Sequence, residues 1–105
     1  MSQTKPLKEL KAGLEALLGP RLVALRLFGS RARGDFDETS DIDVAVIVRN
    51  LTRDLKNQIF QNVADIELRH LTPLSVLVFS NADFERLKKK ERRIALDIER
   101  EGIAL

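Results

Sequence analysis

The sequence has no cysteine, no tryptophan and no tyrosine among its 105 residues, and it has a single histidine. The lack of cysteine excludes disulfides, thiolate metal sites and a cysteine nucleophile. No apolar run approaches the roughly 20 residues of a transmembrane helix, and the first ten residues lack the apolar stretch of a signal peptide. We therefore expect a cytoplasmic location and no membrane partner.

Length and composition predict one domain spanning residues 1–105. The hydrophobic fraction of 44% and the charged fraction of 32% are typical of a soluble globular protein. The net charge of +2 says little, but its distribution is uneven. Residues 35–43 hold five acids and no base, whereas residues 86–93 hold six bases and one acid.

Hydrophobic periodicity predicts helices that alternate with strands. We expect helices over residues 5–18, 53–69 and 81–101, strands over 22–28, 41–48 and 74–79, and a short helix or turn after Ser30, followed by a polar loop over 35–40. The 53–69 helix suits a crossover between parallel strands, and the short connection over 29–40 suits an antiparallel pair. The expected fold class is α+β, with a mixed sheet and flanking helices.

Two aspartates at the start of the second predicted strand point to metal chemistry. Strand side chains alternate between faces, so Asp41 and Asp43 are expected on one face and Ile42 on the other. Two carboxylates this close on a strand bound for the core are costly unless their charge is offset. Mg²⁺ would offset it, since it is commonly held by one or two carboxylates together with substrate phosphates.

Gly29 and Ser30 follow the first predicted strand and are candidates for phosphate contact. Glycine lets the backbone approach a ligand closely, and a helix that begins after Ser30 would aim free N–H groups at an anion. Alone this is a weak signal, because any strand-to-helix turn can use a glycine and a capping serine. Arg31 and Arg33 follow, and each could contact a nucleotide or a partner or simply be exposed on a short helix.

Two other patterns are weaker. Residues 35–41 resemble the start of an EF-hand calcium loop, but Ser40 stands where the turn glycine is required and Val46 where the bidentate glutamate is required. His70 follows a helix and is expected at the surface or a boundary, not as a catalytic base. The basic run 86–93 is expected to be a solvated helix face, with docking of an acidic partner or RNA as the alternative. With no tyrosine or tryptophan for base stacking, we expect no direct nucleic-acid ligand.

Gly29-Ser30, ten intervening residues and Asp41-Ile42-Asp43 together resemble the GS-x10-D-x-D signature of the polymerase-β nucleotidyltransferase superfamily. The surrounding FGSRARGDFDETSDIDVAV and the final IEREGIAL are similar to the minimal nucleotidyltransferases of bacteria and archaea. The resemblance covers the whole chain. It implies a polymerase-β-like fold, in which the first strand leads into the GS turn and the second carries both aspartates.

The resemblance also implies a reaction, the transfer of a nucleoside monophosphate from an NTP, with ATP as the expected donor, to an acceptor hydroxyl. The Gly29–Ser30 turn would hold the β- and γ-phosphates, and Arg31 or Arg33 could neutralise phosphate charge. Asp41 and Asp43 would bind Mg²⁺ and act as the catalytic residues. Catalysis of this kind is mostly positioning and charge neutralisation.

At one point the sequence departs from the superfamily, which usually has a third carboxylate on a later strand. The 74–79 segment has none, and Ser75 or a neighbour is expected at that position. Asp65 and Glu67 would substitute only if the end of the preceding helix lies over the site.

The chain is too short for a separate acceptor-binding domain, so the acceptor is expected on another polypeptide. In the family this partner is typically a small helical HEPN protein, and the pair forms a toxin–antitoxin system in which addition of AMP silences the toxin. The alternative is a non-catalytic antitoxin that binds nucleotide and neutralises its partner by contact. Both a homo-oligomer and a hetero-oligomer are compatible with the sequence.

Overall fold

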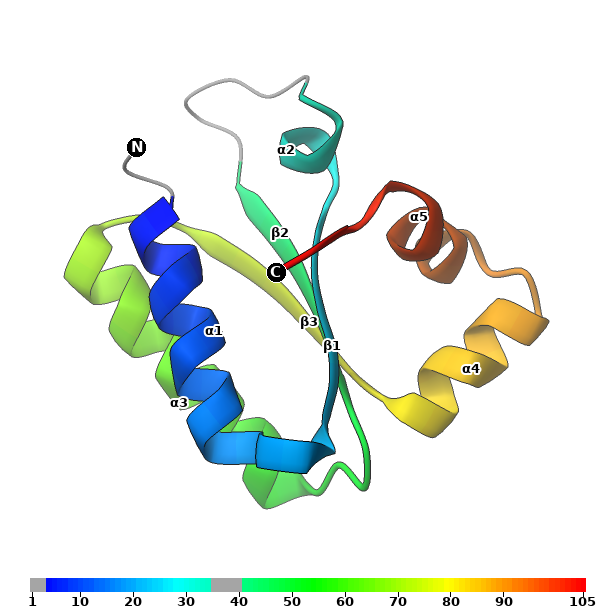
Figure 1. Ribbon diagram of the computed structural model, residues 1–105, viewed down its shortest axis with the longest axis horizontal. Coiled ribbons are helices and arrows are strands. Elements are labelled where there is room, and N and C mark those ends of the chain that lie inside the picture. The colour runs from blue at the N-terminus through cyan, green and yellow to red at the C-terminus, as the bar shows by residue number, and fades with distance from the viewer. Residues whose placement is uncertain (1–3, 35–40) are drawn as a thin grey trace.

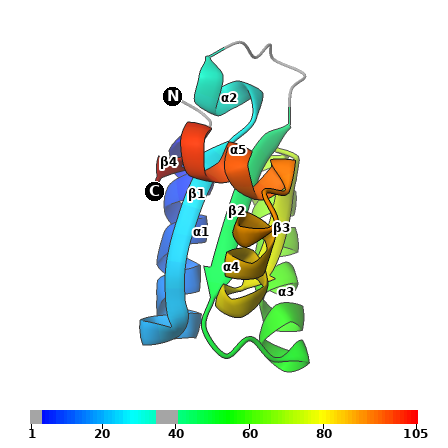
Figure 2. The ribbon, with the colours of Figure 1, turned by 90° about the vertical axis from the view of Figure 1, so that its right-hand side faces the viewer.

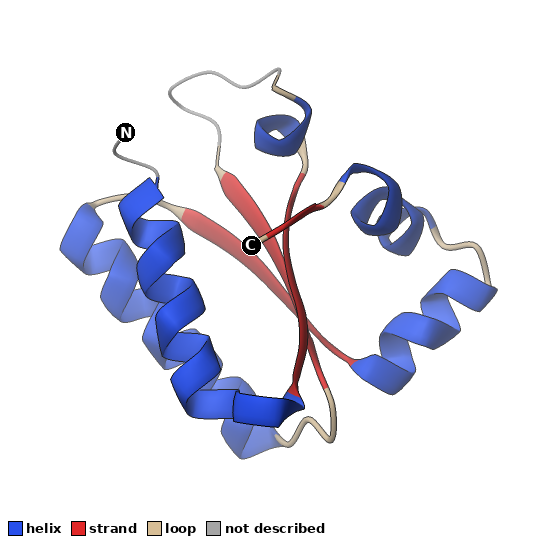
Figure 3. Ribbon diagram, viewed as in Figure 1, coloured by secondary structure: helices blue, strands red, loops and turns tan. Residues whose placement is uncertain are grey.

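The computed structural model describes residues 4–34 and 41–105, so the polar loop predicted over 35–40 lies outside the described residues. Three layers make up the fold, with the strands between two pairs of helices (Figure 3). Along the chain the elements are α1 (Thr4–Leu18), the 3₁₀ turn η1 (Gly19–Arg21), β1 (Leu22–Phe28), α2 (Ser30–Arg33), β2 (Ile42–Val48), α3 (Arg53–His70), β3 (Leu74–Ser80), α4 (Asn81–Lys89), α5 (Arg93–Glu101) and β4 (Ile103–Ala104). None of the described helices has the length and apolarity needed to cross a membrane.

The sheet has four strands in the order β3-β2-β1-β4 (Figure 2). β1 pairs antiparallel with β2 and with β4, and β2 pairs parallel with β3. α3 supplies the crossover that the parallel pair requires. The mixed sheet, its antiparallel first connection and its parallel second connection are therefore confirmed.

Local signals explain where the elements on either side of β3 begin and end. The Thr52 hydroxyl accepts a hydrogen bond from the Leu55 N–H at 3.1 Å and caps α3. α3 ends at His70, because the next residue, Leu71, has a left-handed backbone with φ of 50°. At the end of β3, the Ser80 hydroxyl accepts a hydrogen bond from the Asp83 N–H at 3.0 Å, so α4 begins without an intervening loop.

Two expectations at the C-terminal end are wrong in detail. The single helix predicted over 81–101 is two helices, because Glu91 takes a positive φ of 54° that a right-handed helix cannot continue through. The break lets α5 pack Ala95 and Ile98 against the sheet separately. The tail after Gly102, expected only to pack back, pairs with β1 as the short edge strand β4.

The core lies on both faces of the sheet because β2 is covered on both sides. α1 and α3 cover one face, and α4 and α5 cover the other (Figure 2). On the first face, β2 contributes Ile42, Val44, Val46 and Val48, packed with Leu10, Leu14, Ile59, Val63 and Ile66. On the second it contributes Ala45 and Ile47, packed with Phe28, Phe84, Ala95 and Ile98. By the same alternation, Asp43 lies on the face that α4 and α5 cover.

Candidate functional site

The Gly-Ser turn and the Asp-x-Asp segment lie at the same end of the sheet, where β1 finishes and β2 starts (Figure 1). β1 ends at Phe28, which is paired with Asp43 on the antiparallel neighbour β2. Gly29, the next residue, therefore lies beside the start of β2. Sheet pairing thus brings together two motifs that are ten residues apart in the sequence.

Gly29 lies directly against the carboxylate of Asp43. A Cβ added to Gly29 would be 3.1 Å from Cγ of Asp43 and closer still to Oδ2. The φ of Gly29 is 75°, a conformation that residues with a side chain rarely adopt. Space and backbone conformation both require glycine here, so the turn is built around the position of this carboxylate.

The two aspartates differ in exposure. Asp41 immediately precedes β2 and is exposed, whereas Asp43 is partly buried within the strand. Ile42 between them is fully buried on the opposite face of the sheet. The isoleucine therefore fixes the strand in register and holds the following carboxylate at the rim of the α4–α5 face.

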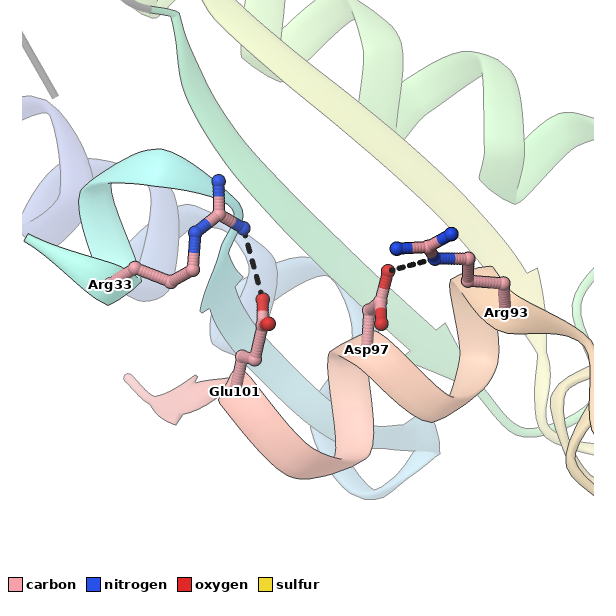
Figure 4. A network of polar contacts seen from close by, with 4 residues as sticks. All are labelled: Arg33, Arg93, Asp97 and Glu101. Atoms are coloured by element: carbon pink, nitrogen blue, oxygen red, sulfur yellow. Dashed lines mark hydrogen bonds and ion pairs between the residues drawn. The ribbon is translucent and has the colours of Figure 1, made fainter. Parts of the chain in front are cut away.

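The arginines lie on α2, a single helical turn that directly follows Gly29. The Arg33 N–H donates to the Gly29 carbonyl at 3.1 Å. Its guanidinium Nη1 donates to Glu101 Oε2 at 3.1 Å and ties α2 to the last turn of α5 (Figure 4). Arg31 is partly buried on the same turn. Ser30 begins α2, but the placement of its side chain lies outside what the structure describes.

At the position where a third carboxylate is expected, the structure has Ser75, which is paired with Asp43 across the β2–β3 ladder. Within the described residues, no three Asp, Glu, His or Cys side chains cluster closely enough to hold a metal ion. Glu67, on α3, accepts a hydrogen bond at 2.9 Å from the N–H of Leu74, the first residue of β3. α3 thus does not bring Asp65 or Glu67 over the site, and these residues do not supply the missing ligand.

The remaining candidates lie elsewhere. His70 Nε2 is 3.1 Å from Glu9 Oε2 on α1, which confirms its expected place at a boundary. Lys88 Nζ lies 3.0 Å from Oε1 of both Glu85 and Glu99. The hydrogen bonds that Lys88 donates to Glu99 first, and then to Glu85, raise the pKa of Lys88. The other cations of the 86–93 run are exposed, as predicted for a solvated face: Arg86, Lys89, Lys90, Arg92 and Arg93.

Residues 14–105 match the family described as "Polymerase beta, Nucleotidyltransferase". The chain belongs to this family, and it is a nucleotidyltransferase. Family membership implies an NTP substrate.

Among known proteins, the chain is 34% identical over 74 residues to "Putative protein adenylyltransferase MJ0141" of Methanocaldococcus jannaschii, covering 70% of this chain and 75% of that protein. It is 40% identical over 47 residues to "Putative protein adenylyltransferase MJ0604" of the same organism, covering 45% of this chain and 47% of the relative. A crystal structure of a "putative nucleotidyltransferase" from Sulfolobus solfataricus has the same fold. Its TM-score is 0.53 at 19% identity, with 98% of this chain and 84% of that chain covered.

Proposed function

We propose that this nucleotidyltransferase transfers AMP from ATP to a hydroxyl group of a partner protein, with Mg²⁺ bound by Asp41 and Asp43. The observation that carries the proposal is the contact between the Gly29 turn and the Asp43 carboxylate. It unites a turn suited to phosphate with a carboxylate suited to a hard cation. The protein acceptor is supported by the two relatives that are named as protein adenylyltransferases.

The donor set fits a metal that also binds the nucleotide. Two carboxylates one pleat apart, with Ser75 as the third neighbour, supply fewer ligands than a divalent cation requires. Phosphate oxygens of ATP would complete the coordination, so metal and nucleotide would bind together. When bound, Mg²⁺ would neutralise charge on the triphosphate and stabilise the departing pyrophosphate.

In this reaction the acceptor oxygen attacks the α-phosphorus of ATP, and the bond from that phosphorus to the pyrophosphate oxygen breaks. Pyrophosphate leaves with the bonding electron pair, and the acceptor hydroxyl loses its proton. Because α3 lies on the other face of the sheet, Glu67 and Asp65 are poorly placed to take that proton. We assign the role of accepting the proton of the acceptor hydroxyl to Asp41, to Asp43 or to a base of the partner. The Gly29–Ser30 turn would hold the β- and γ-phosphates, with Arg31 and Arg33 beside it.

For the acceptor we propose a small helical protein of the HEPN type, in a toxin–antitoxin pair in which addition of AMP silences the toxin. This rests on the resemblance of residues 27–48 to minimal nucleotidyltransferases. We propose that the pair acts in the cytoplasm, where ATP is available. The acceptor would approach the rim formed by Gly29, Asp41 and Asp43, which lies at one end of the sheet.

The test is AMP transfer from labelled ATP and Mg²⁺ to the product of the neighbouring gene, located by mass spectrometry. Wild type should label the partner, and the variant with Asp41→Asn and Asp43→Asn should not. The same variant should lose the Mg²⁺-dependent part of its ATP affinity, measured by calorimetry, while its thermal unfolding shows that the fold is intact. If the ATP affinity of this variant still depends on Mg²⁺, neither aspartate is a ligand of the metal.

A second function is favoured by Ser75, which stands opposite Asp43 where a carboxylate would complete a metal site. In that case the chain binds nucleotide without transferring it and neutralises its partner by contact. Wild type would then inhibit the partner without labelling it. The double Asn variant would inhibit equally well, because contact alone needs no metal.

A further inference from the structure

β3 forms an open edge of the sheet. In the strand order β3-β2-β1-β4 it is terminal, and among the described residues only β2 pairs with it. It is seven residues long, whereas β4 at the other edge has two. Alternate N–H and C=O groups of an edge strand point away from its neighbour and can pair with another strand.

The sequence of β3 contains no charge and no proline to keep an open edge from pairing. Natural edge strands are usually short, or carry lysine, proline or inward charges, because a long apolar edge promotes association. β3 reads LSVLVFS, with no charged residue and no proline. Its central residue, Leu77, is 37% exposed. The edge of β3 is therefore suited to pairing with a strand of another chain.

Beside this edge lies an apolar stripe, which we define as Phe60, Ala64 and Leu68 of α3 together with Leu71, the residue that follows the helix. Phe60, Ala64 and Leu68 are spaced four residues apart, so they project within about 80° of one another on a helix. Leu71 follows Leu68 by three residues, just after the helix ends. Phe60 is 40% exposed, and Leu68 and Leu71 are 75% and 86% exposed. Three large hydrophobic side chains in one row exceed the scattered exposure that is normal on a surface.

The stripe and the β3 edge lie on the same side of the molecule. α1 lies behind β1 and α3 behind β3 (Figure 2). The flank of α3 that faces α1 is polar and forms a groove with Leu17 of α1: Gln58, Gln61, Asn62 and Asp65. The stripe lies on the flank away from that groove. Glu67, adjacent to the stripe, bonds to the Leu74 N–H at the start of β3, which fixes this flank beside the strand.

We propose that β3 and the α3 stripe form a homodimer interface, in which β3 pairs antiparallel with β3 of a second copy and the two stripes pack together. A two-fold axis perpendicular to the sheet makes the edge strands antiparallel and keeps both α3 helices on the same face. With the strands in full register, Leu77 lies at the axis and meets its own copy. The result is a continuous eight-stranded sheet.

The dimensions agree with what a stable dimer needs. At about 3.3 Å per residue, β3 is about 23 Å long. Perpendicular to the sheet, this side of the molecule consists of α3, the sheet and α4, three layers of roughly 10 Å each. A side wall of this size is comparable to the roughly 800 Å² per partner of a specific interface. A second copy presents the same uncharged strand and the same apolar row, so each group meets a matching one.

The experiment is sedimentation velocity from low to high micromolar protein, with Leu68→Glu, Leu77→Lys and the matched control Val23→Glu. Val23 is 41% exposed and lies on β1, away from the β3 edge. We expect a wild-type dimer and an unchanged dimer in the control. Each interface substitution occurs twice in a symmetric dimer, and each should weaken dimerisation by at least about tenfold. Circular dichroism checks folding, which substitution of these exposed side chains should leave intact.

Hydrogen exchange supplies a second readout. Alternate amides of β3 should exchange more slowly as wild-type concentration rises, whereas those of β4 should not change. A wild-type chain that stays monomeric over the whole concentration range overturns the proposal. So does a dimer that survives Leu68→Glu and Leu77→Lys, or one that Val23→Glu dissociates.

Discussion

At the scale of single residues, the Asp43 carboxylate can keep its position only because residue 29 has no side chain. Glycine at the end of β1 leaves room for the carboxylate, and the carboxylate occupies the place of any side chain at position 29. The glycine of the GS motif therefore has a structural role toward the protein's own aspartate, in addition to any approach to phosphate. Gly19 offers a comparison, since its φ is also positive, at 52°, but no atom lies within 4 Å of an added Cβ.

We expect Gly29→Ala to cost more stability than Gly19→Ala. Both substitutions place alanine at positive φ, which costs about 1–2 kcal/mol. Gly29→Ala also forces the Asp43 carboxylate to move, so it should lower Mg²⁺-dependent ATP affinity, and Gly19→Ala should not. Urea unfolding and calorimetry measure the two effects. Equal loss of ATP affinity in both variants would contradict the proposed contact.

At the scale of elements, Lys88 joins the two helices into which the C-terminal segment divides. It contacts Glu85 within α4 and Glu99 on α5, and its Nζ lies 5.5 Å from the centre of the Phe84 ring. Phe84 is buried in the core beneath α4 and α5. Lys88 therefore holds α4 and α5 together across the turn at Glu91, where the helical hydrogen bonding is interrupted.

Replacing Lys88 should remove a contribution to the free energy of unfolding that depends on pH. The pKa of Lys88 is raised above its usual 10.5 by Glu99 and then Glu85. Its stabilising contribution is therefore complete below pH 10.5 and is lost as the pH rises through the raised pKa. Lys88→Met keeps the apolar stem and should destabilise the protein by about 0.5–1 kcal/mol at neutral pH.

The difference between wild type and Lys88→Met in urea unfolding should shrink above about pH 10.5. Arg93→Met is the control, because Arg93 is 93% exposed and lies 3.9 Å from Asp97 (Figure 4). Its effect should be close to zero. A stability difference for Lys88→Met that persists unchanged at high pH would assign the effect to packing instead of charge.

At the scale of the whole molecule, α3 and the Asp43 side chain lie on opposite faces of the sheet. Glu67, on α3, accepts a hydrogen bond from the backbone N–H of Leu74, while Asp43 lies toward α4 and α5. Among the residues that the structure describes, Asp43 has Asp41 two positions before it and Ser75 beside it on β3. This arrangement assigns Glu67 to the stability of the crossover and not to the chemistry.

Glu67→Gln should therefore leave AMP transfer within about twofold of wild type, since the amide oxygen can still accept from Leu74. Glu67→Ala removes the acceptor and should cost about 1–3 kcal/mol of unfolding free energy, again without a specific loss of transfer. Asp43→Asn, assayed in parallel, should abolish transfer. A large loss of activity in Glu67→Gln would show that this carboxylate reaches the reaction.

Local sequence patterns were sufficient wherever the signal is contained in a short stretch. The strand over 22–28, the crossover helix beginning at Arg53 and the placement of Ile42 opposite Asp43 follow from apolar periodicity. The candidate site residues follow from their residue types and from the resemblance of their spacing to the GS-x10-D-x-D signature. The fold class follows from the order of these elements and the lengths of their connections.

Only the tertiary structure decided the features that depend on distant residues. The pairing of Phe28 with Asp43 brings the glycine turn beside the aspartate, and the pairing of Ser75 with Asp43 puts a serine where a third carboxylate was expected. Both pairings depend on the register between strands, which no single segment encodes. β4 forms because β1 offers an edge, and Phe60 faces outward because Ile59 and Val63 fill the core beneath α3. A short stretch can specify which face of an element is apolar, but its neighbours across the sheet determine which apolar side chains are covered.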